Sequence, residues 1–153
     1  METKTTMIIL IVIALIFIFG CIGYSHLFNQ HEQVKIDDIT FNLPEGYHET
    51  KSTNNSGINM SNGLNSMILS KCDEKNIQKN IKQYKDYKNS HNESIKITNF
   101  TANNILVYKS VIVNHTDTIH YWFNYKDNTY TIYTWDGNKN SDKFISELIE
   151  SIQ

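Results

Sequence analysis

The stretch SIKITNFTANNILVYKSVIVNHTDTIHYWFNYKDNTYTIYTW, residues 94–135, alternates apolar and polar side chains along most of its length. Alternation with a period of two is the pattern of a half-buried β-strand. Short polar breaks divide the stretch, so the pattern predicts strands over residues 94–100, 105–113, 118–125 and 129–135. Because the connections between them are short, we expect neighbouring strands to pair antiparallel.

A helix is predicted on each side of this strand region. Over residues 73–89 the sheet-facing positions recur at intervals of four, three and four residues, at Ile77, Ile81, Tyr84 and Lys88. Ser70 or Asp73 can cap this first helix, and acidic residues fill its first turn. The second helix, over residues 141–152, follows Asn140 or Ser141 as cap and has a broader stripe, made of Ile145, Leu148, Ile149 and Ile152.

Strands are also predicted before the first helix. Residues 34–43 alternate in two pieces around Asp37 and Asp38, which indicates a strand pair or one bent strand. After a loop over residues 49–57, a hairpin turns at Asn62 and Gly63. Strands, a helix, four antiparallel strands and a last helix define the α+β class, with helices packed on an antiparallel sheet.

The opening ITFNLPEGY, residues 39–47, together with this order of elements, resembles the PsbP-like fold. That fold is shared by an extrinsic subunit of the oxygen-evolving complex and the Ran-binding Mog protein. The chain also resembles small membrane-anchored archaeal proteins of unknown role. The resemblance extends over residues 34–153 and implies the fold; no functional residue is carried over, because proteins of one fold perform unrelated functions.

The N-terminal run MIILIVIALIFIFGCIGY, residues 7–24, contains no charged side chain. A helix of this length, rising about 1.5 Å per residue, just spans the hydrocarbon layer of about 30 Å. We therefore predict a transmembrane anchor in contact with the lipid bilayer. An alternative is a lipoprotein signal, in which Cys21 would be lipidated; a cleaved signal peptide is disfavoured because no small-x-small cleavage site follows.

Charge near this run favours one orientation. Lys4 and the amino terminus precede it, whereas no lysine follows before Lys35. The positive-inside rule then places residues 1–6 in the cytoplasm. We expect a single-pass membrane protein. Residues 25–33 would form a short stalk, and residues 34–153 would form a domain outside the cell membrane.

Composition excludes some classes of function. The formal net charge is −2, and all the cationic side chains are lysines, so the bidentate arginine contacts typical of nucleic-acid recognition are missing. We expect no nucleic-acid partner, no cofactor and no metal ion. Five asparagines stand in N-x-S/T sequences and are candidate glycosylation sites: Asn54, Asn59, Asn92, Asn99 and Asn114.

The strand pattern also predicts a binding face. If Asn114 lies opposite Asp117 and Lys126 opposite Thr129, one face of the sheet carries Lys109, His120, Trp122, Tyr133 and Trp135. Such a face offers aromatic rings and polar groups to a sugar ring or to a protein partner. The favoured interpretation is a second packed layer beneath the first helix or the N-terminal hairpin, because an open apolar sheet face of this size is unusual in a soluble domain. A register slip of one residue would exchange the two faces of the sheet.

No catalytic arrangement is recognisable in the sequence. His115 and His120 could pair with Asp117, but a turn histidine and a strand histidine five residues apart need not converge, and no nucleophile with a base and an orienting group is evident. We therefore expect a non-enzymatic membrane protein whose domain serves binding or assembly. The alternative is a carbohydrate-active or small hydrolytic protein that uses the aromatic face.

Overall fold

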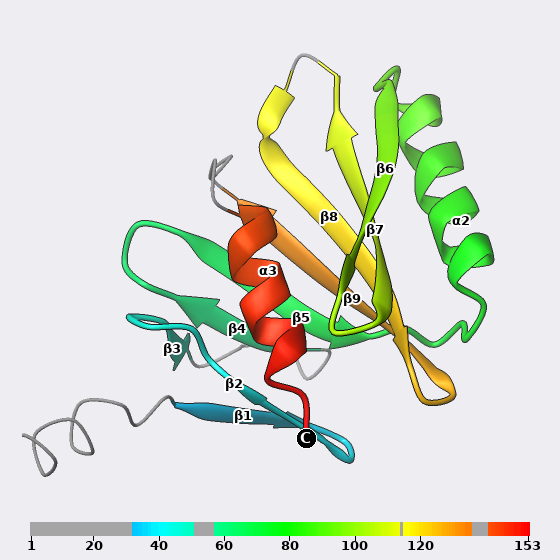
Figure 1. The fold of residues 1–153 in the computed structure, drawn as a ribbon. Coiled ribbons are helices and arrows are strands. Elements are labelled where there is room, and N and C mark those ends of the chain that lie inside the picture. Colours follow the sequence, from blue (N-terminus) through cyan, green and yellow to red (C-terminus); the bar gives the residue numbers. More distant parts are fainter. Residues whose placement is uncertain (1–31, 51–56, 114, 136–140) are drawn as a thin grey trace, which may run out of the picture. The chain divides into compact units, whose positions relative to one another are not determined.

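The computed structural model describes residues 32–50, 57–113, 115–135 and 141–153 (Figure 1). These residues form an α+β unit with a seven-stranded antiparallel sheet, a two-stranded hairpin and two helices. Neither described helix is both long and apolar enough to cross a membrane. The predicted anchor, residues 7–24 with Cys21, lies outside the described residues.

The elements follow one another along the chain in the predicted alternation of strands and helices. They are β1 (Gln33–Ile36), β2 (Ile39–Asn42), β3 (His48–Thr50), β4 (Ile58–Ser61), β5 (Ser66–Lys71), α2 (Ile77–Ser90), β6 (Ile95–Ala102), β7 (Ile105–Ile112), β8 (His115–Tyr125), β9 (Asn128–Trp135) and α3 (Ser141–Glu150). The strand order in the large sheet is β3-β4-β5-β9-β8-β7-β6, with all neighbours antiparallel. The four strands predicted over residues 94–135 are confirmed as β6 to β9.

The N-terminal strands form a pair rather than one bent strand. β1 and β2 pair antiparallel around Asp37, whose φ of 52° lies in the left-handed region that a tight turn needs. The short strand β3 was not predicted, because all three of its side chains are exposed and leave no apolar alternation to detect.

The first helix begins later than predicted. Its cap is Asn76, whose Oδ1 accepts a hydrogen bond from the Lys79 amide at 3.1 Å. Ser70 belongs to β5, and Asp73 lies before the helix, so neither is the cap and the first turn contains no acidic residue. The prediction of cap and first turn was therefore wrong, although the predicted stripe holds: Ile81 is its buried residue.

One face of the large sheet carries the hydrophobic core. The β1–β2 hairpin and α3 lie against this face (Figure 1). The hairpin contributes Val34, Ile39 and Phe41, and the helix contributes Ile145, Leu148 and Ile149. Each such side chain gives about 1.5–3 kcal/mol when it is fully buried, so these two elements are firmly attached.

The pairing of β7 with β8 is irregular near the turn that connects them. Val111 lies opposite Ile119, whereas the next residue, Ile112, lies opposite His115. β8 thus contains extra residues that β7 does not match, as in a bulge. The predicted register, which started from a tight turn over residues 114–117, was wrong by one residue for this pair of strands.

The pairing of β8 with β9 was also mispredicted, with a smaller consequence. Tyr125 lies opposite Asn128, and the turn includes Lys126 with a φ of 52°. The predicted pairing of Lys126 with Thr129 is therefore shifted by two residues. Because side chains alternate with a period of two, such a shift keeps every side chain on its predicted face.

Candidate functional site: an aromatic face half covered by a helix

The four aromatic residues of the predicted face lie together on the sheet face opposite the core. We call His120, Trp122, Tyr133 and Trp135 the aromatic face. The strand β8 supplies the first two and β9 the last two, with His120 directly opposite Tyr133. The centroid of the His120 ring lies 3.9 Å from that of Trp122 and 5.3 Å from that of Tyr133, and the rings of Tyr133 and Trp135 are 5.0 Å apart. The rings therefore form a continuous row.

Helix α2 divides this row into a covered half and an open half. Tyr84 of α2 places its ring edge-on at 4.6 Å from His120 and 5.2 Å from Trp122. Trp122 is consequently only 2% exposed, whereas Trp135 remains 39% exposed. The covered half, His120 and Trp122, is a packed layer beneath the helix, and the open half, Tyr133 and Trp135, is accessible to a ligand.

Lys109 does not belong to this face, which corrects the prediction. The actual register places it opposite Tyr121 on the core face. Its Nζ forms an ion pair with Asp142 at 2.7 Å, at the start of α3. The slip of one residue at the β7–β8 turn is the cause, because it reverses the face of every β7 side chain.

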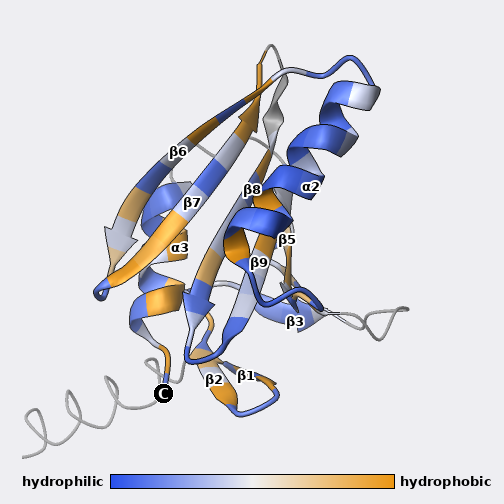
Figure 2. Cartoon of the chain, turned by 90° about the vertical axis from the view of Figure 1, so that its right-hand side faces the viewer, coloured by the Kyte–Doolittle hydropathy of each residue, from blue (hydrophilic) through white to orange (hydrophobic). Residues whose placement is uncertain are grey.

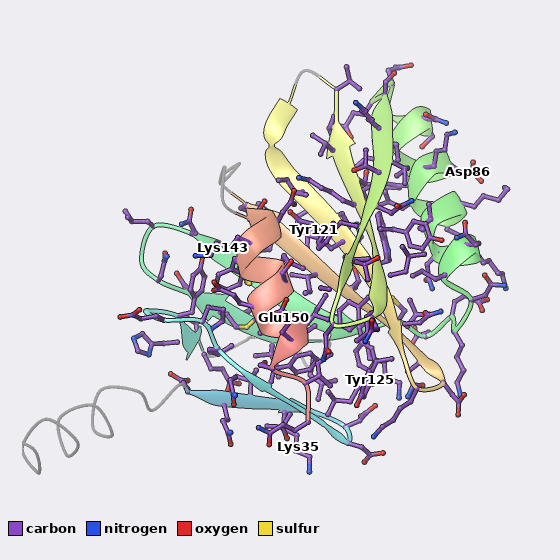
Figure 3. The ribbon with its side chains drawn as sticks, in the orientation of Figure 1. Lys35, Asp86, Tyr121, Tyr125, Lys143 and Glu150 are labelled. Carbon is purple, nitrogen blue, oxygen red and sulfur yellow. The ribbon has the colours of Figure 1, made fainter. Side chains whose placement is uncertain are left out.

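A small polar cluster holds the start of α3 on the sheet. The Tyr121 hydroxyl donates to Asp142 Oδ1 at 2.8 Å and lies 2.7 Å from Ser141 Oγ. Burial raises the pKa of Tyr121 far above its ordinary value, so the hydroxyl stays protonated. Figure 3 shows Tyr121 between β8 and α3. This cluster positions a helix and leaves no group free to react.

Hydrogen bonding fixes the tautomer of His120 in the covered half. Thr131 Oγ1 donates to the carbonyl oxygen of Tyr121 at 3.0 Å, so it can only accept from His120 Nε2. His120 Nδ1 is then an unprotonated acceptor. Burial, and secondarily the charge of Lys88, lowers the pKa of His120 from 6.5 to about 3, which keeps the imidazole neutral at neutral pH.

Two buried polar atoms in or beside the covered half have no hydrogen-bond partner among the described residues. They are His120 Nδ1 and Ser110 Oγ, and their residues lie directly opposite each other on β8 and β7. A buried polar group left without a partner costs about 1–3 kcal/mol. The layer between α2 and the sheet is therefore less favourable than the fully satisfied core on the other face.

The described residues contain no cluster of three or more histidine, cysteine or acidic side chains that could hold a metal ion. The side chains of His115 and Asp117 are not among those that the structure describes. Of the candidate glycosylation sites, Asn92 and Asn99 are exposed and Asn59 is partly buried in β4. Asn54 and Asn114 are not among the described residues.

A polar groove lies away from the aromatic face and was not foreseen from the sequence. It has a volume of about 670 Å³, and its lining includes Lys35, Asp37, Lys71, Cys72 and Lys75. An ion pair between Lys71 and Asp37 forms part of its wall. Burial raises the pKa of the Cys72 thiol to about 11, so the thiol is a poor nucleophile. The groove is lined by both lysine and aspartate side chains, so its charges single out no class of ligand.

Comparisons with known proteins find two solved structures that are similar to the chain at low sequence identity. No protein-family model and no curated protein matches the sequence. A crystal structure of a protein from Bacteroides thetaiotaomicron VPI-5482 is similar with a TM-score of 0.48 and 10% identity; it covers 81% of this chain, which spans only 48% of that protein. The solution structure of cyanobacterial PsbP (CyanoP) from Synechocystis sp. PCC 6803 is similar with a TM-score of 0.45 and 10% identity, over 80% of this chain and 91% of that one.

The similarity to cyanobacterial PsbP agrees with the resemblance that the sequence suggested. At this level of identity the likeness concerns the fold alone and carries no argument about binding or activity.

Proposed function

We propose that the chain is a non-enzymatic, single-span membrane protein that presents its PsbP-like domain outside the cytoplasmic membrane for binding or assembly. The observation that carries the binding role is the open half of the aromatic face. Trp135 is 39% exposed beside Tyr133, with their ring centroids 5.0 Å apart. Exposed, rigid aromatic side chains are typical anchors of protein interfaces.

The anchoring role rests on the sequence. The uncharged run over residues 7–24 has the length of a membrane span, and Lys4 precedes it. Protease digestion of sealed, right-side-out vesicles tests this topology. We expect the domain to be digested from outside while the N-terminus stays protected; a domain shielded inside the vesicle would overturn the proposal.

The binding role is tested by photo-crosslinking in intact cells. A photoreactive phenylalanine analogue at Trp135 should give a discrete adduct with a partner. The matched control is Tyr87, which is 58% exposed on α2 and lies outside the aromatic face. Equal crosslinking at the two positions, or none at Trp135, would count against the open half as a binding surface.

The second candidate is a carbohydrate-active protein, favoured by the same exposed pair, because sugar rings stack on aromatic side chains. Trp122 cannot take part while α2 covers it, since it is only 2% exposed. A glycan array probed with the full chain in nanodiscs distinguishes the candidates. Glycan binding that is lost in Trp135→Ala and retained in Tyr87→Ala would favour this alternative.

A further inference from the structure

The segment that contains α2 is tied to the sheet at its two ends. At the N-terminal end, Thr129 Oγ1 donates to the Lys75 carbonyl oxygen at 2.7 Å. At the C-terminal end, the Val113 amide donates to the Ser94 carbonyl oxygen at 2.8 Å. Residues 76–93 lie between these two ties.

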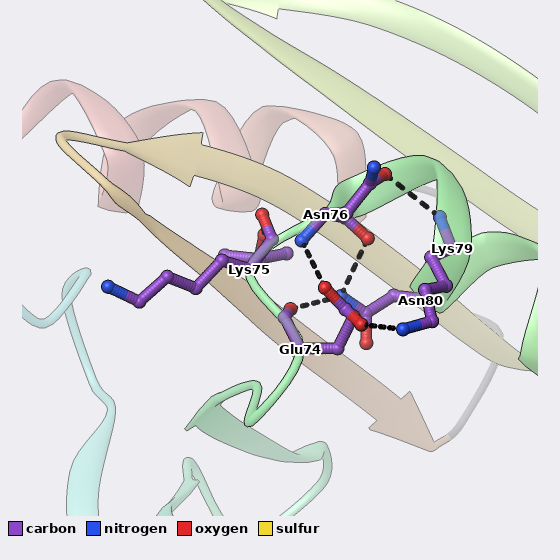
Figure 4. A network of polar contacts seen from close by, with 6 residues as sticks. Glu74, Lys75, Asn76, Lys79 and Asn80 are labelled. Carbon is purple, nitrogen blue, oxygen red and sulfur yellow. Dashed lines mark hydrogen bonds and ion pairs between the residues drawn. The ribbon is translucent and has the colours of Figure 1, made fainter.

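Between the ties, α2 contacts the sheet through Ile81 and through the Tyr84 ring that lies against His120 and Trp122. Ile81 is its one buried residue, and Figure 2 shows a mostly hydrophilic helix. Its ion pairs remain within the helix and its flanks: Lys79 with Glu74, Lys82 with Asp86, and Lys88 with Glu93. Figure 4 shows the network at the N-terminal end, where Asn80 Nδ2 also donates to the Glu74 carbonyl oxygen at 2.6 Å. The helix therefore keeps these polar contacts whether or not it touches the sheet.

The surface beneath α2 would gain hydrogen bonds if the helix moved away. Ser110 Oγ and His120 Nδ1 are buried without partners in the described structure. Water would satisfy both atoms once they were exposed, which offsets part of the cost of exposing Trp122. Most buried polar groups in folded proteins are paired, so two such atoms beneath one helix favour a state in which water reaches them.

We propose that α2 is a movable cover of the aromatic face, hinged at Lys75 and Ser94, and that protonation of His120 favours its open position. Opening would add Trp122 and His120 to the open half and so lengthen the row of accessible rings. The proposal concerns the helix alone and holds whatever the open half binds.

The groups around His120 determine the direction of the pH dependence. From α2, Tyr84 and Lys88 face His120; from β9, Tyr133 does. The side chain of Lys88 is only 12% exposed and pairs with Glu93 at 2.7 Å, so a cation already lies near the imidazole. A protonated His120 is therefore disfavoured beneath the closed helix and favoured in water.

The closed and open states differ in their affinity for protons. The pKa of His120 is about 3 when α2 is closed, against an ordinary value of 6.5 that applies when the ring is hydrated. Between these two values the open state binds more protons, so acid favours opening, and above pH 6.5 the effect disappears. These values correspond to a rise of about 25-fold in the opening constant between pH 7 and pH 5.

Hydrogen exchange of the full chain in nanodiscs measures this opening, after correction for the intrinsic pH dependence of exchange. We expect the opening constant for amides of residues 76–93 to rise by about 25-fold from pH 7 to pH 5, while amides of β8 and β9 stay protected. In His120→Phe the rise should fall to less than about twofold. An unchanged constant in the wild type, the same rise in His120→Phe, or parallel loss of protection in helix and strands would each overturn the proposal.

Two further variants keep the test decisive if His120→Phe does not fold. Lys88→Met removes the charge beside the imidazole, but burial is the larger cause of the lowered pKa of His120, so the rise from pH 7 to pH 5 should stay close to the wild-type value; loss of the rise would show that Lys88 rather than His120 carries it and would overturn the proposal. Trp135→Phe leaves Trp122 as the single tryptophan. Acrylamide quenching of its fluorescence should increase from pH 7 to pH 5; quenching that stays constant would contradict an open state.

Discussion

Replacing Tyr121 by phenylalanine tests how α3 is held on the sheet. The substitution removes only the hydroxyl that donates to Asp142 at 2.8 Å and contacts Ser141 Oγ at 2.7 Å. A hydrogen bond to a neutral group contributes about 1 kcal/mol and one to a charged group about 1.5–3 kcal/mol. Since Lys109 still pairs with Asp142, at 2.7 Å, we expect a net loss of about 2 kcal/mol.

Urea denaturation of the full chain in a mild detergent, followed by far-ultraviolet circular dichroism, measures this loss. The matched control is Tyr125→Phe on the same strand and the same face. Its ring is partly buried against the core, and its contact with Lys126 Nζ, 5.4 Å from the ring centroid, survives in phenylalanine. The control should change the free energy of unfolding by less than about 0.5 kcal/mol. Equal effects of the two substitutions would refute the role assigned to the Tyr121 hydroxyl.

Three other predictions concern packing and reactivity. Ile145→Ala empties a fully buried site under α3 and should lower the free energy of unfolding in urea by about 2–5 kcal/mol; a loss below about 1 kcal/mol would contradict the packing of this helix. Gly57→Ala places a Cβ 2.2 Å from Ser70 Oγ, so we expect a loss of about 1–3 kcal/mol in the same assay, and wild-type stability would argue against this close approach. Burial raises the pKa of Cys72 from 9.0 to about 11, so its alkylation by iodoacetamide at pH 8 should be about a hundredfold slower than in the urea-unfolded chain. The rates are measured in a Cys21→Ser background, and equal rates would contradict the buried thiol.

Local patterns explain what the sequence could predict about the fold. The strands over residues 94–135 were found because each has a buried and a less buried face, and alternation encodes that difference directly. The start of α2 was missed for a tertiary reason. Thr129 Oγ1 donates to the Lys75 carbonyl oxygen, and Glu74 Oε1 accepts a hydrogen bond from the Asn76 amide at 3.0 Å. The acidic residues therefore precede the helix instead of filling its first turn.

The candidate site was predicted in part for the same reasons. His120, Trp122, Tyr133 and Trp135 share a face because a register error of two residues preserves the faces of β8 and β9. Lys109 was misplaced because extra residues of β8 near the β7–β8 turn shift the register by one. The amino-acid types of these residues do not indicate such a shift. A cover over this face was expected from the first helix or from the N-terminal hairpin, and the sequence could not choose between them, since propensity does not determine where a surface helix docks.

The contacts between β2 and the last residues of the chain have a consequence for the order of folding. Ser151 Oγ accepts from the Asn42 amide at 2.9 Å, and the Gln153 amide donates to the Thr40 carbonyl at 3.2 Å. Figure 1 shows the C-terminus beside the β1–β2 hairpin. The β1–β2 hairpin therefore cannot complete its side of the core before residues 141–153 are in place. Contacts so distant in sequence close a large loop of chain, so we expect this side of the core to form late in folding.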